Sequence, residues 1–217
     1  MSLRPTPYGS KFRIVHALLL FLAAAAAPAS AKEVQILAFG DSLTAGYGLP
    51  PNQGFAPQLE DALRRNGIPA FVANAGVSGD TTAAGRARIK WTLDGLKRKP
   101  DLAIVALGGN DMLRGIPPRQ TKSDMDFILA ELRRRNIKVL IAGMLAAPNL
   151  GPAYGAEFNR IFPDLAKKHS TGFYPFFLAN VAGDARLSLP DRIHPNFQGI
   201  KRVVSGILPD VVKALKR

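Results

Sequence analysis

The chain has 217 residues, of which 47% are hydrophobic and 21% are charged, as is ordinary for one globular domain with a sizeable core. It contains no cysteine, which excludes thiol catalysis, disulfide bonds and cysteine-based zinc sites. The formal net charge is +13, but the basic residues are scattered and no nucleic-acid-binding motif is visible, so nucleic acid is not expected as a partner. The charge indicates either weak association with an anionic membrane surface or simple solvation of the protein surface.

Residues 1–31 have the features of a secretory signal peptide that is cleaved after Ala31. A basic start precedes an apolar run over residues 14–27, and the small-residue motif Ala29-Ser30-Ala31 follows the run. The run is shorter than the about 20 residues that a membrane-spanning helix needs, so a signal peptide is favoured over the alternative, an uncleaved membrane anchor. The sequence therefore predicts a periplasmic or secreted protein with a single domain at residues 32–217.

The first half of this domain alternates apolar runs with helical patterns. In chain order it predicts the strand Val34–Phe39, a helix from Phe55 that stops at Gly67, the strand Ala70–Ala73, the helix Thr82–Leu96 and the strand Leu102–Leu107. The run at 102–107 is unbroken by charge, as is typical of a buried parallel strand.

The second half continues the alternation. Thr121 and Asp124 resemble a capping box that opens a helix with Met125, Ile128 and Leu129 on one face. The remaining elements predicted are the strand Val139–Met144, the helix Tyr154–Lys168, a weak fifth strand Phe173–Phe176, and a helix Phe197–Lys216 that breaks near Pro209. Alternation of this kind predicts an α/β fold: a three-layer α/β/α sandwich around a flavodoxin-like, parallel, five-stranded sheet.

Two polar motifs follow strands that are neighbours in such a sheet. Gly40-Asp41-Ser42-Leu43 follows the first strand, and Gly109-Asn110-Asp111 follows the third. The carboxyl ends of these strands meet at the switch point, where open α/β sheets bind ligands. Ser42 is therefore a candidate nucleophile, provided that a base reaches it.

Elimination among three histidines selects the base. His16 lies in the leader, and His169 lies at the end of a helix, where a surface histidine is unremarkable. His194 remains, with Asp191 three residues before it, so that one turn can bring the carboxylate against the imidazole. A carboxylate in that place fixes the tautomer of the ring and stabilises the imidazolium that forms when the serine is deprotonated. Taken alone, the Asp-x-x-His-Pro motif is a loop turn; together with Ser42 it predicts a Ser-His-Asp hydrolase.

Acyl transfer also needs hydrogen-bond donors for the developing oxyanion. Three candidates are the side-chain amide of Asn110 and the backbone N–H groups of Ser42 and Gly76. The alternative for Asn110 is a role in a turn. Thr44 replaces the second glycine of the Gly-x-Ser-x-Gly elbow of α/β-hydrolases, which argues for a different fold.

These motifs together resemble the SGNH (GDSL-type) hydrolase superfamily, in particular its bacterial periplasmic branch of thioesterase I, lysophospholipase and arylesterase enzymes. Gly40-Asp41-Ser42-Leu43 resembles the first block of the family, Gly76 the second, Gly109-Asn110-Asp111 the third, and Asp191-x-x-His194 the fifth. The resemblance covers the chain from about Val34 onward. It implies a covalent acyl-serine mechanism with Ser42, Asp191 and His194, without a metal or other cofactor.

The resemblance also assigns further residues. It implies an oxyanion hole from Ser42, Gly76 and Asn110, and structural roles for Asp41 and Asp111. It makes the loop after the fourth strand a cover for the acyl chain, with the substrate-binding residues Met144, Leu145, Ala146, Pro148 and Leu150.

The function expected is therefore that of an exported serine esterase acting on small-molecule carboxylic esters and thioesters. One alternative is a deacetylase of cell-wall or surface polysaccharide, since the same machinery cleaves sugar acetates. Another is a catalytically silent lipid- or glycan-binding module. A mostly apolar groove would favour the first function, and exposed aromatic residues at its rim would favour a sugar substrate.

Overall fold

Five parallel strands form the centre of the fold, in the spatial order β2-β1-β3-β4-β5. They are β1 (Val34–Gly40), β2 (Ala70–Gly76), β3 (Leu102–Ala106), β4 (Lys138–Ala142) and β5 (Gly172–Tyr174). The computed structural model describes residues 1–2 and 32–216, so the expected leader falls, apart from its first two residues, outside the described residues. The order confirms the flavodoxin-like topology.

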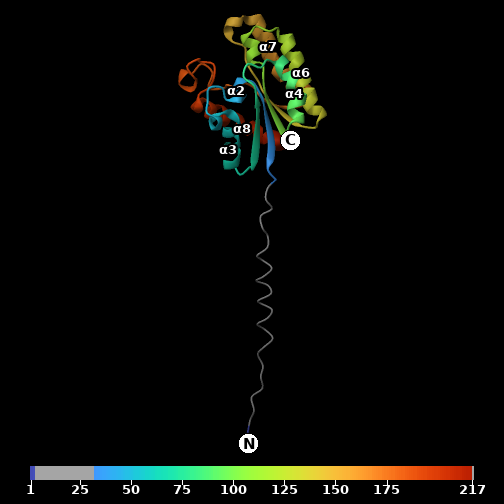
Figure 1. The fold of residues 1–217 in the computed structure, drawn as a ribbon, viewed down its shortest axis with the longest axis vertical. Coiled ribbons are helices and arrows are strands. Elements are labelled where there is room, and N and C mark those ends of the chain that lie inside the picture. The colour runs from blue at the N-terminus through green and yellow to red at the C-terminus, as the bar shows by residue number, and fades with distance from the viewer. Residues whose placement is uncertain (3–31, 217) are drawn as a thin grey trace. The chain divides into compact units, whose positions relative to one another are not determined.

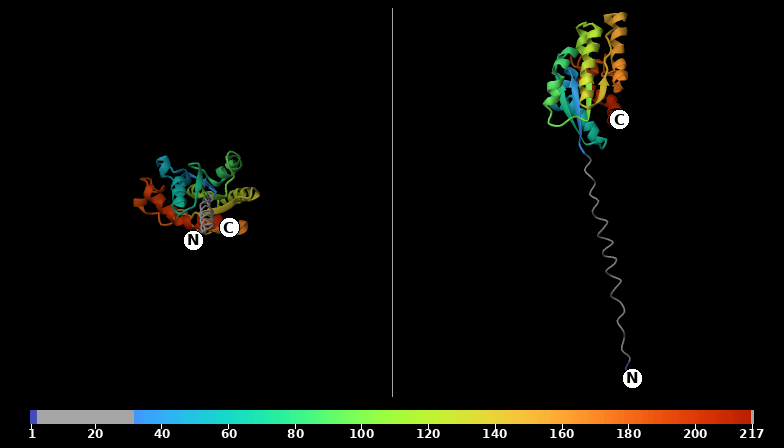
Figure 2. Two further views of the ribbon diagram at one scale, coloured as in Figure 1. Left: turned by 90° about the horizontal axis from the view of Figure 1, so that it is seen from below. Right: turned by 90° about the vertical axis from the view of Figure 1, so that its right-hand side faces the viewer.

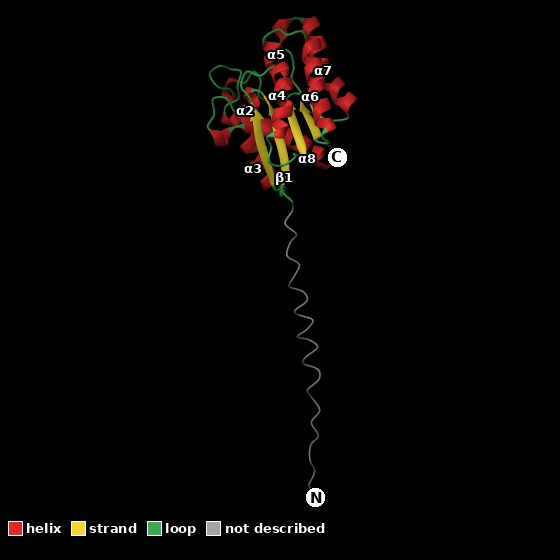
Figure 3. Ribbon diagram, turned by 45° about the vertical axis from the view of Figure 1, so that its right-hand side comes forward, coloured by secondary structure: helices red, strands yellow, loops and turns green. Residues whose placement is uncertain are grey.

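Helices cover both faces of the sheet (Figure 1). One face carries α3 (Phe55–Arg65) and α8 (Phe197–Lys216), which pack against each other. The other carries α4 (Thr82–Asp94), α6 (Pro118–Arg134) and α7 (Pro152–His169), which lie side by side (Figure 2, right; Figure 3). The predicted three-layer α/β/α sandwich is thus confirmed.

The two central strands β1 and β3 are nearly continuous apolar runs, and they are buried. All five residues of β3 are buried, as are six of the seven in β1. Strands with helices on both faces need apolar side chains on both sides, which explains why β1 and β3 show no alternation of polar and apolar residues.

Pairing between strands extends β2 beyond its predicted end at Ala73. Asn74, Ala75 and Gly76 pair in register with residues 38–40 of β1. The result aligns Gly40 with Gly76 on one side and with Ala106 of β3 on the other. Three chain segments therefore leave the sheet at the same edge.

Two predictions about helices are wrong. Thr121 and Asp124 do not cap α6, which begins earlier at Pro118; both side chains are buried within the helix. Thr121 donates instead to Asp111, 3.1 Å away, and Asp124 accepts from Arg86 at 2.9 Å.

The last helix, α8, also runs through Pro209 without a break. Pro209 has no N–H group, so the carbonyl of Ser205 four residues earlier has no donor within the helix. Both residues are exposed, so water can donate to that oxygen. The buried residues Ile207, Val211 and Ala214 hold the two halves of the helix on the sheet. Among the described residues, no helix combines the length and the hydropathy needed to cross a membrane.

Candidate active site

The turn after β1 places Ser42 at the carboxyl edge of the sheet. The Asp41 carboxylate accepts the N–H of Leu43 at 3.0 Å and so caps the short helix α2 (Ser42–Ala45). As the first residue of a helix, Ser42 has an N–H without an intrahelical acceptor. A Cβ on Gly40 would overlap the Thr44 side chain and the carbonyl of Ala106, so only glycine allows this turn.

A chain of two hydrogen bonds joins Asp191, His194 and Ser42. The Nδ1 atom of His194 lies 2.7 Å from Asp191 Oδ2, and its Nε2 atom lies 2.8 Å from Ser42 Oγ. An ionised Asp191 accepts a hydrogen bond from the N–H at Nδ1. The Nε2 atom then carries no proton and can accept a hydrogen bond from the Ser42 hydroxyl. The structure therefore brings together three residues from the two ends of the domain.

The Asp191 carboxylate is held ionised by its own loop. Its Oδ1 atom accepts the backbone N–H groups of His194 at 3.0 Å and Ile193 at 2.9 Å. The His194 N–H, the His194 ring and the Ile193 N–H, in that order, lower the pKa of Asp191 to about 2. Asp191 is thus a fixed negative charge at every pH at which the protein is expected to work.

Asn110 faces the same pocket from the turn after β3. It is the second residue of α5 (Gly109–Leu113), which begins after Gly108 in a left-handed conformation, φ 109°. Its Nδ2 group donates one hydrogen bond to the Asp80 carbonyl at 2.9 Å. An amide nitrogen carries two protons, so the second remains for a ligand.

Gly76 differs from what the sequence predicts. Its N–H donates to Asn74 Oδ1 at 2.9 Å, and it does not line the pocket that contains Ser42 and Asn110. A Cβ on Gly76 would overlap the backbone of Thr44 and Ala45. The glycine is required because α2 packs directly on the end of β2, and in this conformation its N–H is not free to bind an oxyanion.

The pocket at Ser42 has a volume of about 690 Å³. As predicted, Met144, Leu145, Ala146 and Pro148 line it. Leu150 does not, because the chain turns away at the 3-10 helix Pro148–Leu150 toward α7.

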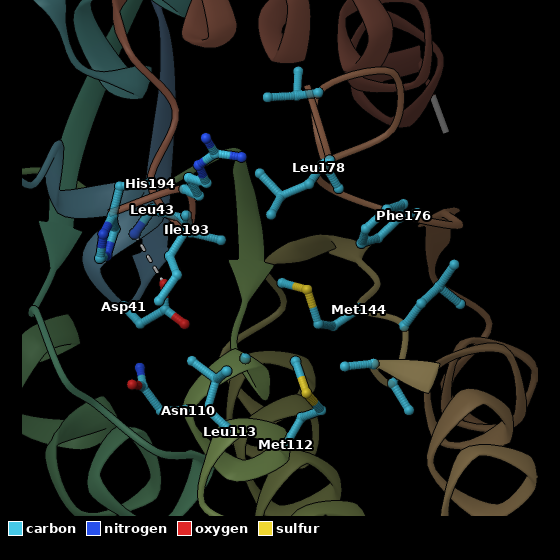
Figure 4. A pocket seen from close by; sticks show the side chains of 18 of the residues that line it. Asp41, Leu43, Asn110, Met112, Leu113, Met144, Phe176, Leu178, Ile193 and His194 are labelled. Atoms are coloured by element: carbon cyan, nitrogen blue, oxygen red, sulfur yellow. Dashed lines mark hydrogen bonds between the residues drawn. The ribbon is translucent and has the colours of Figure 1, made fainter. Parts of the chain in front are cut away.

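The rest of the pocket wall comes from residues that the sequence did not single out. They are Met112, Leu113, Phe176, Leu178 and Val181. Figure 4 shows His194, Asp41 and Asn110 on one side of the pocket and Leu178, Phe176 and Met144 on the other. Most of them lie outside the motifs and strands, so only the folded chain brings them to Ser42.

Arg88 and Asp80 form a frame behind the two catalytic turns. Arg88 donates to Asp80 Oδ2 at 2.6 Å and to the Gly40 carbonyl at 2.9 Å, and its guanidinium lies 4.1 Å from the centre of the Phe39 ring. Since the Asp80 carbonyl holds Asn110, this frame connects the end of β1 to α5. Nothing in the sequence around Arg88 indicates this role.

Two aspartates next to the candidate site have different surroundings. Asp111 accepts hydrogen bonds from the backbone and side chain of Thr82 and from Thr121, and so ties α5 to α4 and α6. The Asp41 carboxylate accepts a hydrogen bond from the Leu43 N–H, and the residue is 2% exposed. Burial raises the pKa of Asp41 to about 6, although the Leu43 N–H and the proximity of His194 oppose the change.

Two aromatic side chains, Tyr47 and His169, each lie against another part of the chain. The Tyr47 ring, 52% exposed, lies 4.5 Å from the ring of His194 and covers its outer face. His169 is not a surface residue as predicted: its side chain is 7% exposed, and its Nε2 atom lies 2.6 Å from Asp126. It lies on α7, whereas Ser42 and His194 lie together in the pocket.

No cluster of three or more His, Asp or Glu side chains suited to a metal ion occurs in the described part of the chain. The pocket itself presents a hydroxyl with a paired imidazole, two N–H donors and apolar walls.

Comparison with known proteins gives a consistent assignment. Residues 38–202 match the GDSL-like Lipase/Acylhydrolase family. The chain is 50% identical to the solved structure of AlinE4, a SGNH-hydrolase family esterase, with a TM-score of 0.73 over 84% of this chain and 97% of that one.

Two curated relatives have names that describe activities. An arylesterase from Vibrio mimicus is 34% identical over 94% of this chain and 99% of its own length. The thioesterase 1/protease 1/lysophospholipase L1 of Escherichia coli (strain K12) is 34% identical over 83% of this chain and 84% of its own. The family match at residues 38–202 covers most of the domain and includes Ser42, Asp191 and His194.

Proposed function

The chain belongs to the GDSL-like Lipase/Acylhydrolase family and is an ester and thioester hydrolase, and we propose that Ser42 is the nucleophile through which it acts. The observation that carries the proposal is the continuous hydrogen-bonded chain from Asp191 through His194 to Ser42. A hydroxyl in contact with an oriented imidazole is the arrangement that acyl transfer requires.

The first half of the reaction acylates the enzyme. Ser42 Oγ attacks the carbonyl carbon of the substrate while its proton passes to His194 Nε2. Asp191 stabilises the resulting imidazolium. The tetrahedral oxyanion accepts hydrogen bonds from the Ser42 N–H and the Asn110 side chain. When the intermediate collapses, His194 gives its proton to the leaving oxygen or sulfur.

The second half frees the enzyme. His194 takes a proton from water, the hydroxide attacks the acyl-serine, and collapse returns the proton to Ser42 Oγ. The first and the last proton transfers run along the 2.8 Å contact between Ser42 Oγ and His194 Nε2, and the same Nε2 atom serves the leaving atom and the water, so no other titrating residue is needed.

The apolar walls support esters of small to medium acyl chains as substrates. The side chains of Met112, Met144, Phe176 and Leu178 can cover an alkyl chain, but they offer few groups that could bind a sugar hydroxyl. This favours an acyl ester over the alternative, an acetylated polysaccharide.

We infer from the sequence where the protein is located and which surface attracts it. The signal-peptide pattern of residues 1–31 supports export to the periplasm or beyond, with Lys32 as the first residue of the mature protein. The net positive charge supports weak attraction to anionic membrane surfaces. N-terminal sequencing of the protein from its host tests the first point: an intact Met1 on mature protein would contradict it.

Ser42→Ala tests the nucleophile. The variant removes one hydroxyl from a partly exposed turn, so we expect a folded protein without measurable hydrolysis of p-nitrophenyl butyrate. Circular dichroism serves as the control for folding. A folded variant with wild-type kcat would remove Ser42 from the mechanism.

A further inference from the structure

Arg192 occupies a position in the catalytic loop that arginine seldom adopts. It stands between Asp191 and His194 with φ 57°, in the left-handed region. Glycine, asparagine and aspartate enter this region most readily, whereas a long side chain is disfavoured there. Its backbone N–H donates to the Leu189 carbonyl at 2.9 Å, an interaction that any residue but proline could make. The turn therefore does not explain why the residue is arginine.

Arg192 lines the pocket, and its guanidinium has no partner among the residues that the structure describes. Within residues 32–216, Arg192 is exposed and no ion pair or side-chain hydrogen bond involves it. Arg88, by contrast, is held by Asp80 and the Gly40 carbonyl. Besides His194, the only other ionisable residue of the pocket lining is the buried Asp41, so Arg192 is the permanent cation of an otherwise mostly apolar wall.

The position of Arg192 on the loop decides which part of a substrate it meets. His194 must protonate the leaving atom, so the leaving group lies beside the loop that carries both residues. The acyl chain is expected at the opposite wall, where Met144, Phe176 and Leu178 lie (Figure 4). Arg192 is therefore on the side of the leaving group.

From this placement we propose that Arg192 determines specificity by binding an anionic phosphate on the alcohol or thiol that leaves. The proposal rests on the proposed function, because it takes the roles of Ser42 and His194 as given. A guanidinium matches phosphate oxygens with two parallel hydrogen bonds, and its charge does not titrate. Two sources have this chemistry: the nucleotide part of an acyl-coenzyme A, and the glycerophosphate head group of a lysophospholipid.

A series of three substrates with one acyl group tests the proposal. Butyryl-coenzyme A has an anionic leaving group, p-nitrophenyl butyrate a neutral one, and S-butyrylthiocholine a cationic one. The quantity to compare is the ratio of kcat/KM between substrates, which cancels general damage to the catalytic loop.

Arg192→Asn is the informative variant, because asparagine tolerates the left-handed backbone and carries no charge. We expect its coenzyme A to p-nitrophenyl ratio to fall about tenfold, the loss of one charge-assisted contact. The ratio for the thiocholine ester should rise. Arg192→Lys, which keeps the charge but not the planar fork, should lie between the two. Salt at about 0.5 M should lower the wild-type ratio by screening an exposed charge.

Arg160→Ala is the matched control. Arg160 is an exposed arginine on α7 that is not part of the pocket lining, and within residues 32–216 it makes no ion pair. Its removal changes the net charge as much as Arg192→Asn does. The ratio should stay at the wild-type value if position, and not net charge, is what matters.

A second pair of substrates tests the lipid head group separately. Lysophosphatidylglycerol and the matching monoacylglycerol, both below their critical micelle concentrations, differ by the phosphate head group. A lower ratio in Arg192→Asn for this pair alone assigns the lipid head group; a lower ratio for butyryl-coenzyme A alone assigns the soluble thioester.

The proposal would be overturned if wild type and Arg192→Asn had equal kcat/KM ratios for both the coenzyme A and the lipid pairs of substrates. It would also be overturned if Arg160→Ala lowered these ratios as much as Arg192→Asn does. Neither result would affect the assignment of Ser42 as the nucleophile. That assignment is tested separately by the hydrolysis of p-nitrophenyl butyrate, which has no charged leaving group.

Discussion

The chain contains two Asp–His pairs with similar contacts and different surroundings. In one, His194 Nδ1 lies 2.7 Å from Asp191; in the other, His169 Nε2 lies 2.6 Å from Asp126. The free nitrogen of His194 meets Ser42 in the pocket. The free nitrogen of His169 is buried without a hydrogen-bond partner among the described residues. The proposed catalytic role of His194 therefore depends on what its second ring nitrogen faces, and not on the Asp–His contact itself.

The second pair joins two helices. Asp126 on α6 accepts from His169 and from Lys168, 2.7 Å away, both on α7. Burial opposes ionisation of Asp126, but the hydrogen bonds from Lys168 and His169 outweigh it and lower its pKa. This is a structural contact, and the two pairs provide internal controls for each other.

The largest expected difference is between two alanine variants. His194→Ala should lower kcat by about 10⁴-fold or more, because no other base reaches Ser42. His169→Ala should keep kcat close to that of the wild type. Steady-state hydrolysis of p-nitrophenyl butyrate measures both. The opposite pattern would exchange the roles of the two histidines.

A second difference lies in the amide donor that only the His194 site possesses. Asn110→Ala should lower kcat by about 10²–10³-fold with little change in KM, because the interaction strengthens as charge develops on the oxyanion. If Asn110 only held its turn through the Asp80 carbonyl, the melting temperature would fall and kcat would not.

The two sites differ next in a buried carboxyl group that only the catalytic one has. The pKa of Asp41 is raised to about 6 in the folded protein, above the ordinary value of 3.8. A group of this kind contributes stability at low pH that is lost as the pH rises through about 6. Asp41→Asn, neutral at every pH, should therefore be more stable than the wild type at pH 8 by about 3 kcal/mol.

The control is the pH itself. The stability difference between Asp41→Asn and wild type should shrink as the pH is lowered toward 4, where both side chains are neutral. Urea unfolding at several pH values measures it. A difference that is the same at all pH values would show that Asp41 is not ionised at pH 8 or is not strained when ionised.

The smallest effect is expected at the structural pair. His169→Ala removes a mostly buried side chain that bonds to Asp126, so the free energy of unfolding should fall by about 1–2 kcal/mol. His194→Ala should change the free energy of unfolding by less, because the His194 side chain is 17% exposed and that of His169 only 7%. Urea unfolding of both variants at one pH measures the two changes in the free energy of unfolding. Equal losses of stability would contradict the distinction between the two sites.

The sequence predicted what depends on local pattern. The apolar runs identified all five strands, and the topology then placed Ser42 beside Asn110 at one edge. His194 followed by elimination, since the leader removes one histidine and a helix end disfavoured another. The reason given for His169 was wrong, because burial of a helix end against α6 cannot be read from Lys167-Lys168-His169 alone.

What the sequence missed depends on contacts between distant segments. Arg88 on α4 reaches the Gly40 carbonyl at the end of β1, and Tyr47 meets His194 only after both loops fold. The Gly76 N–H was expected to be free, but the side chain of Asn74 turns back to it. Leu150 follows Pro148 by two residues and still misses the pocket because the chain turns there.

Labelling with a fluorophosphonate, followed by peptide mapping, tests the central claim most directly. The reagent reacts with a serine only when that serine is activated as a nucleophile. One adduct is expected, on Ser42, formed at the wild-type rate in His169→Ala and far more slowly in His194→Ala. An adduct on another residue, or equal labelling of the two variants, would contradict it.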